Sequence, residues 1–388
     1  MHIQENFMNS GINVLTMNDK EKYVMKRCKR CILPEGFPGI SFNDEGICNF
    51  CADYKEFRRP LGKDKLIDLV KSTKRQGRFD CVIPASGGKD STYILYYTVK
   101  ELGLRPLAVH YDSGYQTGMS KNNLKSACHI LNAPLIIKKS SPDIQKKIIR
   151  QALLISEIVG SFTSRTCGNC EIMLRTVSLN AAREHNIPFV FWGSSPLESL
   201  DSKDYEGYRH GKSLFEAITS KITRFRELGL TPLKITRVMP RVIKYNILSI
   251  CQRIQMGVPL KYAIHPTKVF PFPEKDPQFV HFFDYITWDS VRGVKLLEKE
   301  LNWKRPEDKL SRFDCLLHCF GNHHHLQLKQ ITDDGKTYSN FVRENKMDRK
   351  EALMLEENIR NTVTGECRKI IEGLGLAQYR MPLLKSPD

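Results

Sequence analysis

One continuous stretch of the sequence decides the fold: Phe79-Asp80-Cys81-Val82-Ile83-Pro84-Ala85-Ser86-Gly87-Gly88-Lys89-Asp90-Ser91. Residues 79–85 are mostly apolar and predict a buried strand, and residues 91–102 have the pattern of a helix. The two adjacent glycines between them let the backbone curl into a concave array of N–H groups. The positive end of the following helix favours an anion at the same place. The stretch therefore predicts a phosphate-binding loop between a strand and a helix.

The polar side chains of this loop indicate how a phosphate is held. Ser86 and Ser91 can donate hydroxyl hydrogen bonds, and Lys89 carries a compact positive charge. We expect Lys89 to stabilise the charge that builds on a leaving phosphate group. Asp90 repels phosphate, so we expect it to cap the helix or to help hold magnesium. Lys89 and Asp90 are the candidate catalytic residues, and no general base is assigned.

Strand and helix signals alternate after the loop. Strands are expected at 106–111, 135–138 and 187–192, and helices at 120–131, 143–158 and 170–185. This alternation predicts an α/β fold, with a doubly wound parallel sheet covered on both faces. Asp112 follows the second strand, and ligands bind at the carboxyl ends of such strands. We expect Asp112 to contact adenosine or magnesium, although an Asp at a strand end also serves as a turn residue.

Composition and charge divide the chain into five predicted segments. These are a flexible tail at 1–25, a zinc-ribbon module at 26–58, the α/β domain at 59–200, a basic helical segment at 201–270 and a helical C-terminal region at 271–388. Residues 203–268 contain 13 Lys or Arg and four Asp or Glu, within a chain whose net charge is +17. Such a segment is typical of a surface that binds RNA, acidic lipid or a partner subunit, and also of a helical face exposed to solvent. Its helices are expected to break at Pro232, Pro240 and Pro259.

Four of the 12 cysteines form two closely spaced pairs, Cys28-x2-Cys31 and Cys48-x2-Cys51. The start of the chain lacks the pattern of a secretory signal, and no apolar run approaches the roughly 18 residues that span a bilayer. We therefore expect a cytoplasmic protein with thiolate metal ligands rather than disulfides. The spacing predicts a closed, structural Zn²⁺ site. The run His323–His325 is expected to be a polar surface cluster without a metal.

In its strand–loop–helix context, Ser86–Ser91 resembles the PP-loop of the ATP pyrophosphatases, a HUP-like superfamily also called adenine nucleotide alpha hydrolases. The resemblance implies that the loop, from Ser86 through Gly87, Gly88, Lys89 and Asp90 to Ser91, binds the pyrophosphate end of ATP together with Mg²⁺. It also implies the chemistry: AMP is transferred to a carbonyl-type oxygen, and a nitrogen or sulfur nucleophile then displaces AMP.

A second resemblance covers most of the chain. Four stretches, Cys28–Pro34, Ile40–Cys51, Trp192–Glu198 and Phe283–Asp289, are similar to the N-acetyl sugar amidotransferases of lipopolysaccharide and flagellin sugar biosynthesis. This resemblance implies adenylation of an N-acetyl oxygen and amination with ammonia from a glutaminase subunit. Gly193 and Ser194 would then contact the ligand. Where family members tend to have Gly-Glu-Asn-Pro, this chain has Gly193-Ser194-Ser195-Pro196.

A third resemblance is local. Cys167-Gly168-Asn169-Cys170-Glu171 is similar to the C-x-x-C of iron–sulfur-dependent tRNA thiolation enzymes. It implies a [4Fe-4S] cluster on Cys167, Cys170 and Cys315, with Cys319 as a substitute third ligand, and sulfur transfer to tRNA or a small molecule. The alternative is that these cysteines only pack a helix start and a core. A nucleotide-binding scaffold without turnover is a further, non-enzymatic hypothesis.

Overall fold

The computed structural model describes residues 25–54, 60–72, 77–159, 165–194, 197, 231–258, 277–307 and 312–381, without the side chains of 165–168 and 290–291. The predicted tail, apart from residue 25, and positions 201–230 and 259–270 of the predicted basic segment lie outside the described residues. Within the described part, no helix combines the length and the apolar character needed to cross a membrane.

A five-stranded parallel sheet forms the centre of the molecule. Its strands lie in the order β3-β2-β1-β4-β5. Their bounds are β1 Cys81–Pro84, β2 Pro106–Asp112, β3 Leu135–Lys139, β4 Phe189–Trp192 and β5 Gln278–His281. The first four confirm the strands expected from the apolar runs. Strand β5 corrects the expectation of a mainly helical chain beyond residue 271, because its four residues pair with β4 and extend the sheet.

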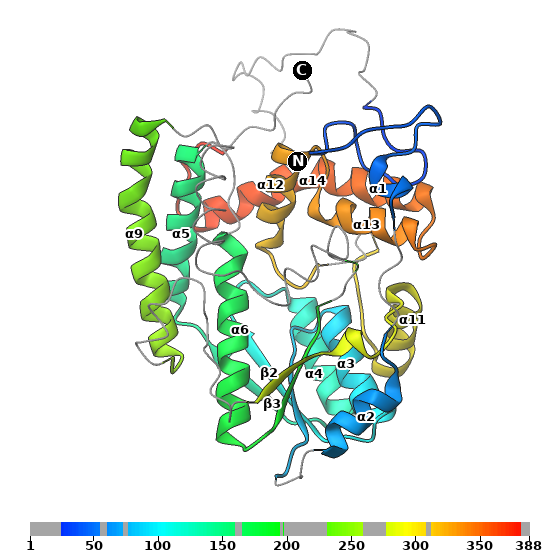
Figure 1. The fold of residues 1–388 in the computed structure, drawn as a ribbon. Coiled ribbons are helices and arrows are strands. Elements are labelled where there is room, and N and C mark those ends of the chain that lie inside the picture. The colour runs from blue at the N-terminus through cyan, green and yellow to red at the C-terminus, as the bar shows by residue number, and fades with distance from the viewer. Residues whose placement is uncertain are drawn as a thin grey trace, which may run out of the picture.

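Helices cover both faces of the sheet, as predicted (Figure 1). One face packs on α2 (Lys63–Ser72), α3 (Lys89–Lys100), α4 (Gly118–Ile130) and α11 (Ser290–Leu301). The other face packs on α6 (Arg165–Glu184). Successive residues of β1 face opposite cores, since Val82 belongs to the α6 side and Ile83 to the α3 side. Burial on both faces explains why the strands are apolar runs rather than alternating ones.

Helix α9 (Pro232–Gln255) runs along α5 (Pro142–Val159) at the edge of the molecule (Figure 1). Thr231 caps α9 by accepting a hydrogen bond from the Lys234 N–H, and Pro232 stands in the first turn, where proline fits. The expected break at Pro240 is wrong, because α9 continues through it. Burial of Val238 and Tyr245 against α5 outweighs the one backbone hydrogen bond that a proline removes. Pro259 lies outside the described residues.

Three C-terminal helices, α12 (His318–Lys329), α13 (Asp333–Arg343) and α14 (Arg349–Gly373), form a layer above the sheet (Figure 1). The N-cap of α14 is Asp348, as expected, and its carboxylate accepts from the N–H groups of Lys350 and Glu351. This layer carries the cysteine module, which includes the short helix α1 (Asn49–Ala52) and shares one hydrophobic core with α13 and α14. The segment leading into α12 reaches back to the sheet domain, where Cys315 forms an antiparallel bridge with Gln116.

Candidate active site and metal centre

The glycine loop has the predicted left-handed turn. Gly87 has φ +82°, and a Cβ atom there would stand 2.1 Å from the carbonyl oxygen of Ser120. Only glycine fits both the backbone angle and the close approach of α4. Gly88 is the N-cap of α3, and the helix begins at Lys89. The loop therefore joins β1 to α3 directly at the carboxyl end of the sheet.

The loop's carbonyl groups are held by surrounding residues. The Ser86 oxygen accepts from Ser120 Oγ at 2.5 Å and from the side-chain amide of Gln116. The Gly87 oxygen accepts from Trp303 Nε1 at 2.9 Å, and the Gly88 oxygen accepts from Ser91 Oγ at 3.3 Å. The first amide groups of a helix have no intrahelical acceptor. With its carbonyls bonded to its surroundings, the loop presents the start of α3 as an anion site.

Lys89 and Asp90 pair with each other. Lys89 Nζ lies 2.6 Å from Asp90 Oδ2, and the lysine is only 5% exposed. Trp288 Nε1 donates to Asp90 Oδ1 at 2.5 Å from 198 residues further along the chain. The expectation that Asp90 caps the helix is wrong, because the N-cap is Gly88 and has no side-chain cap. Asp90 instead fixes Lys89 and Trp288 beside the loop.

A pocket of about 410 Å³ opens between the loop and the C-terminal layer. It lies where the strand order reverses between β1 and β4, the usual ligand position in such sheets. Its volume falls in the range of small-molecule sites, roughly 300–1,000 Å³. Of the predicted ligand-binding residues, it is lined by Ser86, Gly88, Lys89, Asp90, Ser91, Gly193 and Ser194. The structure thus brings the loop and the end of β4 to one cavity.

Asp112 stands outside the residues that line this pocket. Its Oδ1 atom accepts from the Gly114 N–H at 2.8 Å, and its Oδ2 atom lies 3.5 Å from Lys121 Nζ. Burial opposes its ionisation, but the hydrogen bond and the lysine together hold the pKa of the carboxyl below its usual range. In this structure Asp112 acts as a turn residue, and its contact with adenosine or magnesium stays a prediction.

The wall opposite the loop comes from residues 312–318, which the sequence singled out only for Cys315. Arg312 has φ +49° and pairs with Asp333 at 3.3 Å, and His318 Nε2 lies 3.1 Å from Asp334. Burial disfavours the charged form of His318, but Asp334 outweighs it and raises the pKa of the imidazole. Asp314 also lines the pocket, and its Oδ2 lies 3.3 Å from where a Gly88 Cβ would stand. In the sequence, the charged residues Arg312 and Asp314 beside Cys315 were the signal that could have indicated this wall.

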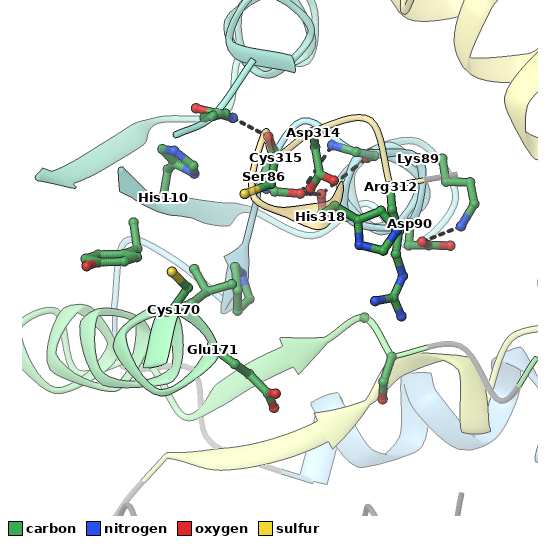
Figure 2. A pocket seen from close by; sticks show the side chains of 18 of the residues that line it. Ser86, Lys89, Asp90, His110, Cys170, Glu171, Arg312, Asp314, Cys315 and His318 are labelled. Atoms are coloured by element: carbon green, nitrogen blue, oxygen red, sulfur yellow. Dashed lines mark hydrogen bonds and ion pairs between the residues drawn. The ribbon is translucent and has the colours of Figure 1, made fainter. Parts of the chain in front are cut away.

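Two of the predicted cluster ligands, Cys170 and Cys315, line the pocket, and Figure 2 shows them on facing walls. Cys170 comes from α6, and Gln145 Nε2 lies 3.7 Å from its sulfur. Cys167 lies in the same helix, but its side chain is outside the described residues. Cys319 is 3% exposed in the core between α12 and α14 and does not line the pocket. The donor set facing the cavity therefore includes two thiols.

The expectation of a surface histidine cluster is wrong. His323 is fully buried and His324 is 8% exposed, because α12 packs against α13 and α14. Burial lowers the pKa of His323 to about 4 and that of His325 to about 3, so both rings are neutral near pH 7. These histidines belong to the interior of the C-terminal layer, and no metal is assigned to them.

The N-terminal cysteine module brings its four thiols together. The Sγ atoms of Cys28, Cys31, Cys48 and Cys51 all lie within 4.8 Å of one another and are buried. The Cys28–Cys51 and Cys31–Cys48 sulfur distances are both 3.8 Å. A tetrahedral ion with metal–sulfur bonds of about 2.3 Å places its ligands about 3.8 Å apart. A cluster would spread the thiolates over several irons, so the geometry fits a single tetrahedral ion.

Arg343 completes the surroundings of these thiols. Its Nε lies 3.3 Å from Cys51 Sγ and its Nη2 lies 3.5 Å from Cys31 Sγ. Burial disfavours the charged guanidinium, but the neighbouring thiolates outweigh it and raise the pKa of Arg343. Such a second layer orients the ligands and offsets their negative charge. Arg343 ends α13, so this residue connects the cysteine module to the C-terminal layer.

No protein-family model matches the chain, and no curated protein matches it. Among solved structures, a similar chain is the U34-tRNA thiolase NcsA from Methanococcus maripaludis with its [4Fe-4S] cluster. The two sequences are 13% identical, and the alignment covers 94% of this chain and 92% of that chain with a TM-score of 0.33. So distant a likeness has no weight in assigning a function to this chain.

Proposed function

We propose that this chain is an ATP-dependent sulfur transferase of the PP-loop type. The observation that carries the proposal is the shared pocket, in which Cys170 and Cys315 face the cavity that the glycine loop opens into. A phosphate-binding loop alone would suit many nucleotide enzymes. Two thiols on the opposite walls of the same cavity favour sulfur as the nucleophile.

The proposed reaction has two displacements. A carbonyl-type oxygen of the acceptor attacks the α-phosphorus of ATP, the bond between the α-phosphorus and the bridging oxygen breaks, and pyrophosphate leaves. A sulfide-level sulfur then attacks the activated carbon, and the carbon–oxygen bond breaks as AMP leaves. The acceptor ends with sulfur in place of its oxygen, and the oxygen leaves with AMP. The acceptor class is a tRNA base or a small molecule.

Different residues of the chain would bind the phosphates, the Mg²⁺ ion and the cluster. Backbone amides at the start of α3 bind the phosphates, and the carbonyl contacts from Trp303 and Ser120 hold the loop in shape. Asp90 and Asp314 are the carboxylates beside the loop that suit a Mg²⁺ ion bound with ATP. Cys170 and Cys315, with Cys167 earlier in α6, would hold a [4Fe-4S] cluster, which when bound supplies an iron with an open position for sulfide.

Separate assays for the two displacements test this proposal. Wild type, Cys170→Ser and Cys315→Ser are compared with Cys251→Ser, which changes an exposed thiol on α9. We expect both pocket variants to lose thiolated product at least 100-fold while retaining ATP binding, and Cys251→Ser to behave as wild type. Full sulfur transfer in either pocket variant would refute the role of these cysteines.

The N-acetyl sugar amidotransferase is a second candidate, favoured by one contact. The stretch Phe283–Asp289 that resembles that family packs on the start of α3, with Trp288 bonded to Asp90 and its ring centroid 4.3 Å from that of Tyr93. In this case ammonia from a glutaminase subunit displaces AMP from an adenylated N-acetyl group. Stimulation of AMP formation by ammonium in place of sulfide, undiminished in Cys170→Ser, would favour this candidate over sulfur transfer.

We further propose that the N-terminal module holds Zn²⁺ as a structural ion. Four buried thiolates close a tetrahedral site and leave no position for substrate. Because thiolate ligands must stay reduced, the cytoplasm is the compartment that suits them. Metal analysis of purified protein tests the assignment, with about one zinc per chain expected and a Cys48→Ser variant expected to lose it.

A further inference from the structure

The glycine loop brings no net side-chain charge to the pyrophosphate end of ATP. Lys89 is its cation and Asp90 its anion, and the two are 2.6 Å apart. From the sequence, we expected Lys89 to stabilise the negative charge that builds on the leaving pyrophosphate. A lysine already paired with a carboxylate offers much less to that charge. Backbone amides supply only partial charges, and a Mg²⁺ ion bound with ATP offsets only part of the negative charge of the phosphates, so the phosphate chain calls for a further full positive charge from the protein.

Arg312 supplies such a charge from the opposite wall. It lines the same pocket as Ser86 and Gly88, and Figure 2 shows its side chain extending into the cavity from the segment before α12. The Asp333 carboxylate, 3.3 Å away, holds the guanidinium in place from the start of α13. Its left-handed backbone, with φ +49°, is uncommon for a residue other than glycine, and such backbone strain is concentrated at functional sites.

Asp333 is not paired with Arg312 alone. That carboxylate also lies 3.2 Å from Lys336 Nζ, so it is shared between two full cations. Next to it, the charged form of His318 is stabilised by Asp334 at 3.1 Å. Asp333 therefore neutralises the Arg312 guanidinium only in part, and Asp314, the third carboxylate of this wall, lies beside the loop where Mg²⁺ is proposed to bind. A fixed guanidinium that is only partly neutralised suits a multiply charged phosphate chain.

We propose that Arg312 binds the pyrophosphate end of ATP and holds the pyrophosphate product across the pocket from the glycine loop. This inference rests on the proposed ATP-using function and adds the residue that binds the leaving group. A guanidinium can donate two parallel hydrogen bonds to phosphate oxygens, which an ammonium cannot do. The expected selectivity is therefore for pyrophosphate over the phosphate of AMP.

Calorimetric titration of magnesium ATP, magnesium pyrophosphate and AMP into wild type, Arg312→Gln and Arg312→Lys tests the proposal. Loss of a hydrogen bond to a charged group corresponds to roughly 10–100-fold in affinity. We expect Arg312→Gln to weaken pyrophosphate binding at least tenfold and AMP binding less than twofold, with Arg312→Lys in between. The control is Arg292→Gln, which removes another guanidinium paired with an aspartate, 3.7 Å from Asp289, at an exposed position that does not line the pocket, and it should bind pyrophosphate as wild type does.

The outcomes distinguish failure of the role proposed for Arg312 from failure of the proposed ATP-using function. Unchanged pyrophosphate affinity in Arg312→Gln overturns the inference, and so does an equal loss of AMP and pyrophosphate binding, which would indicate a structural role. Wild-type protein that binds AMP but not pyrophosphate also overturns it and leaves the nucleotide pocket standing. Wild-type protein that binds neither ATP nor AMP overturns the proposed function itself. The melting midpoint of each variant checks that it is folded.

Discussion

A single methyl group at Gly87 should distort the glycine loop and weaken the ATP binding proposed for it. In Gly87→Ala the residue must hold φ +82°, which costs an L-residue roughly 1–2 kcal/mol. Its Cβ would also stand 2.1 Å from the Ser120 carbonyl oxygen, so the start of α4 has to move. That movement breaks the hydrogen bond from Ser120 Oγ to the Ser86 oxygen, worth about 1 kcal/mol. We expect the free energy of unfolding to fall by about 2–3 kcal/mol.

Urea unfolding followed by tryptophan fluorescence, together with ATP titration, measures both consequences. Because the displaced loop loses hydrogen bonds to a charged ligand, ATP affinity should fall at least tenfold. Gly365→Ala is the matched control, since a Cβ there meets nothing within 4 Å, and alanine should stabilise α14 by roughly 0.5–1 kcal/mol. If Gly87→Ala unfolds at the wild-type urea concentration and binds ATP normally, the left-handed turn at Gly87 and its contact with Ser120 do not hold the loop.

Three further predictions concern other parts of the molecule. Arg343→Gln should weaken metal binding about 10–100-fold in a chelator competition, whereas Arg349→Gln, which donates to the carbonyl oxygens of Cys28 and Cys31, should change it less. Burial raises the pKa of Glu356 to about 7 from its usual 4.5. Ionising it therefore favours the unfolded chain, and wild type should lose up to about 3 kcal/mol relative to Glu356→Gln as pH rises from 4.5 through 7, a difference that urea unfolding at pH 5 and 8 measures. Trp303→Phe should lower ATP affinity severalfold without unfolding the protein, because it removes one hydrogen bond of about 1 kcal/mol to Gly87. An ATP titration identical to wild type would show that this bond does not hold the loop.

Helix α13 connects the two sites of the molecule. Its first residues, Asp333 and Asp334, hold Arg312 and His318 at the pocket wall, and its last residue, Arg343, contacts the thiols of the cysteine module. The cysteine module packs on this helix through one shared core. The cysteine module therefore packs against the same helix whose first residues hold the side chains of the pocket wall.

The local sequence determined the elements whose partners lie nearby in the chain. The first four strands, the turn at Gly87, the cap at Asp348 and the cysteine pairs each follow from a few consecutive residues. Their physical basis is short-range: backbone angles, strand burial, capping hydrogen bonds and ligand spacing. Four thiols at the observed spacing gather in the structure as the pattern predicted.

Tertiary structure alone decided which distant side chains complete the pocket. Trp288 and Trp303 reach the loop from 198 and 216 residues along the chain from their partners, Asp90 and Gly87, and no local pattern marks such contacts. Strand β5 has only four residues and becomes a strand by pairing with β4. Likewise, the approach of Arg312 to the pocket depends on how the C-terminal layer packs on the sheet domain. A sequence pattern records the preferences of neighbouring residues, whereas the charge balance of a pocket is set by every element that packs around it.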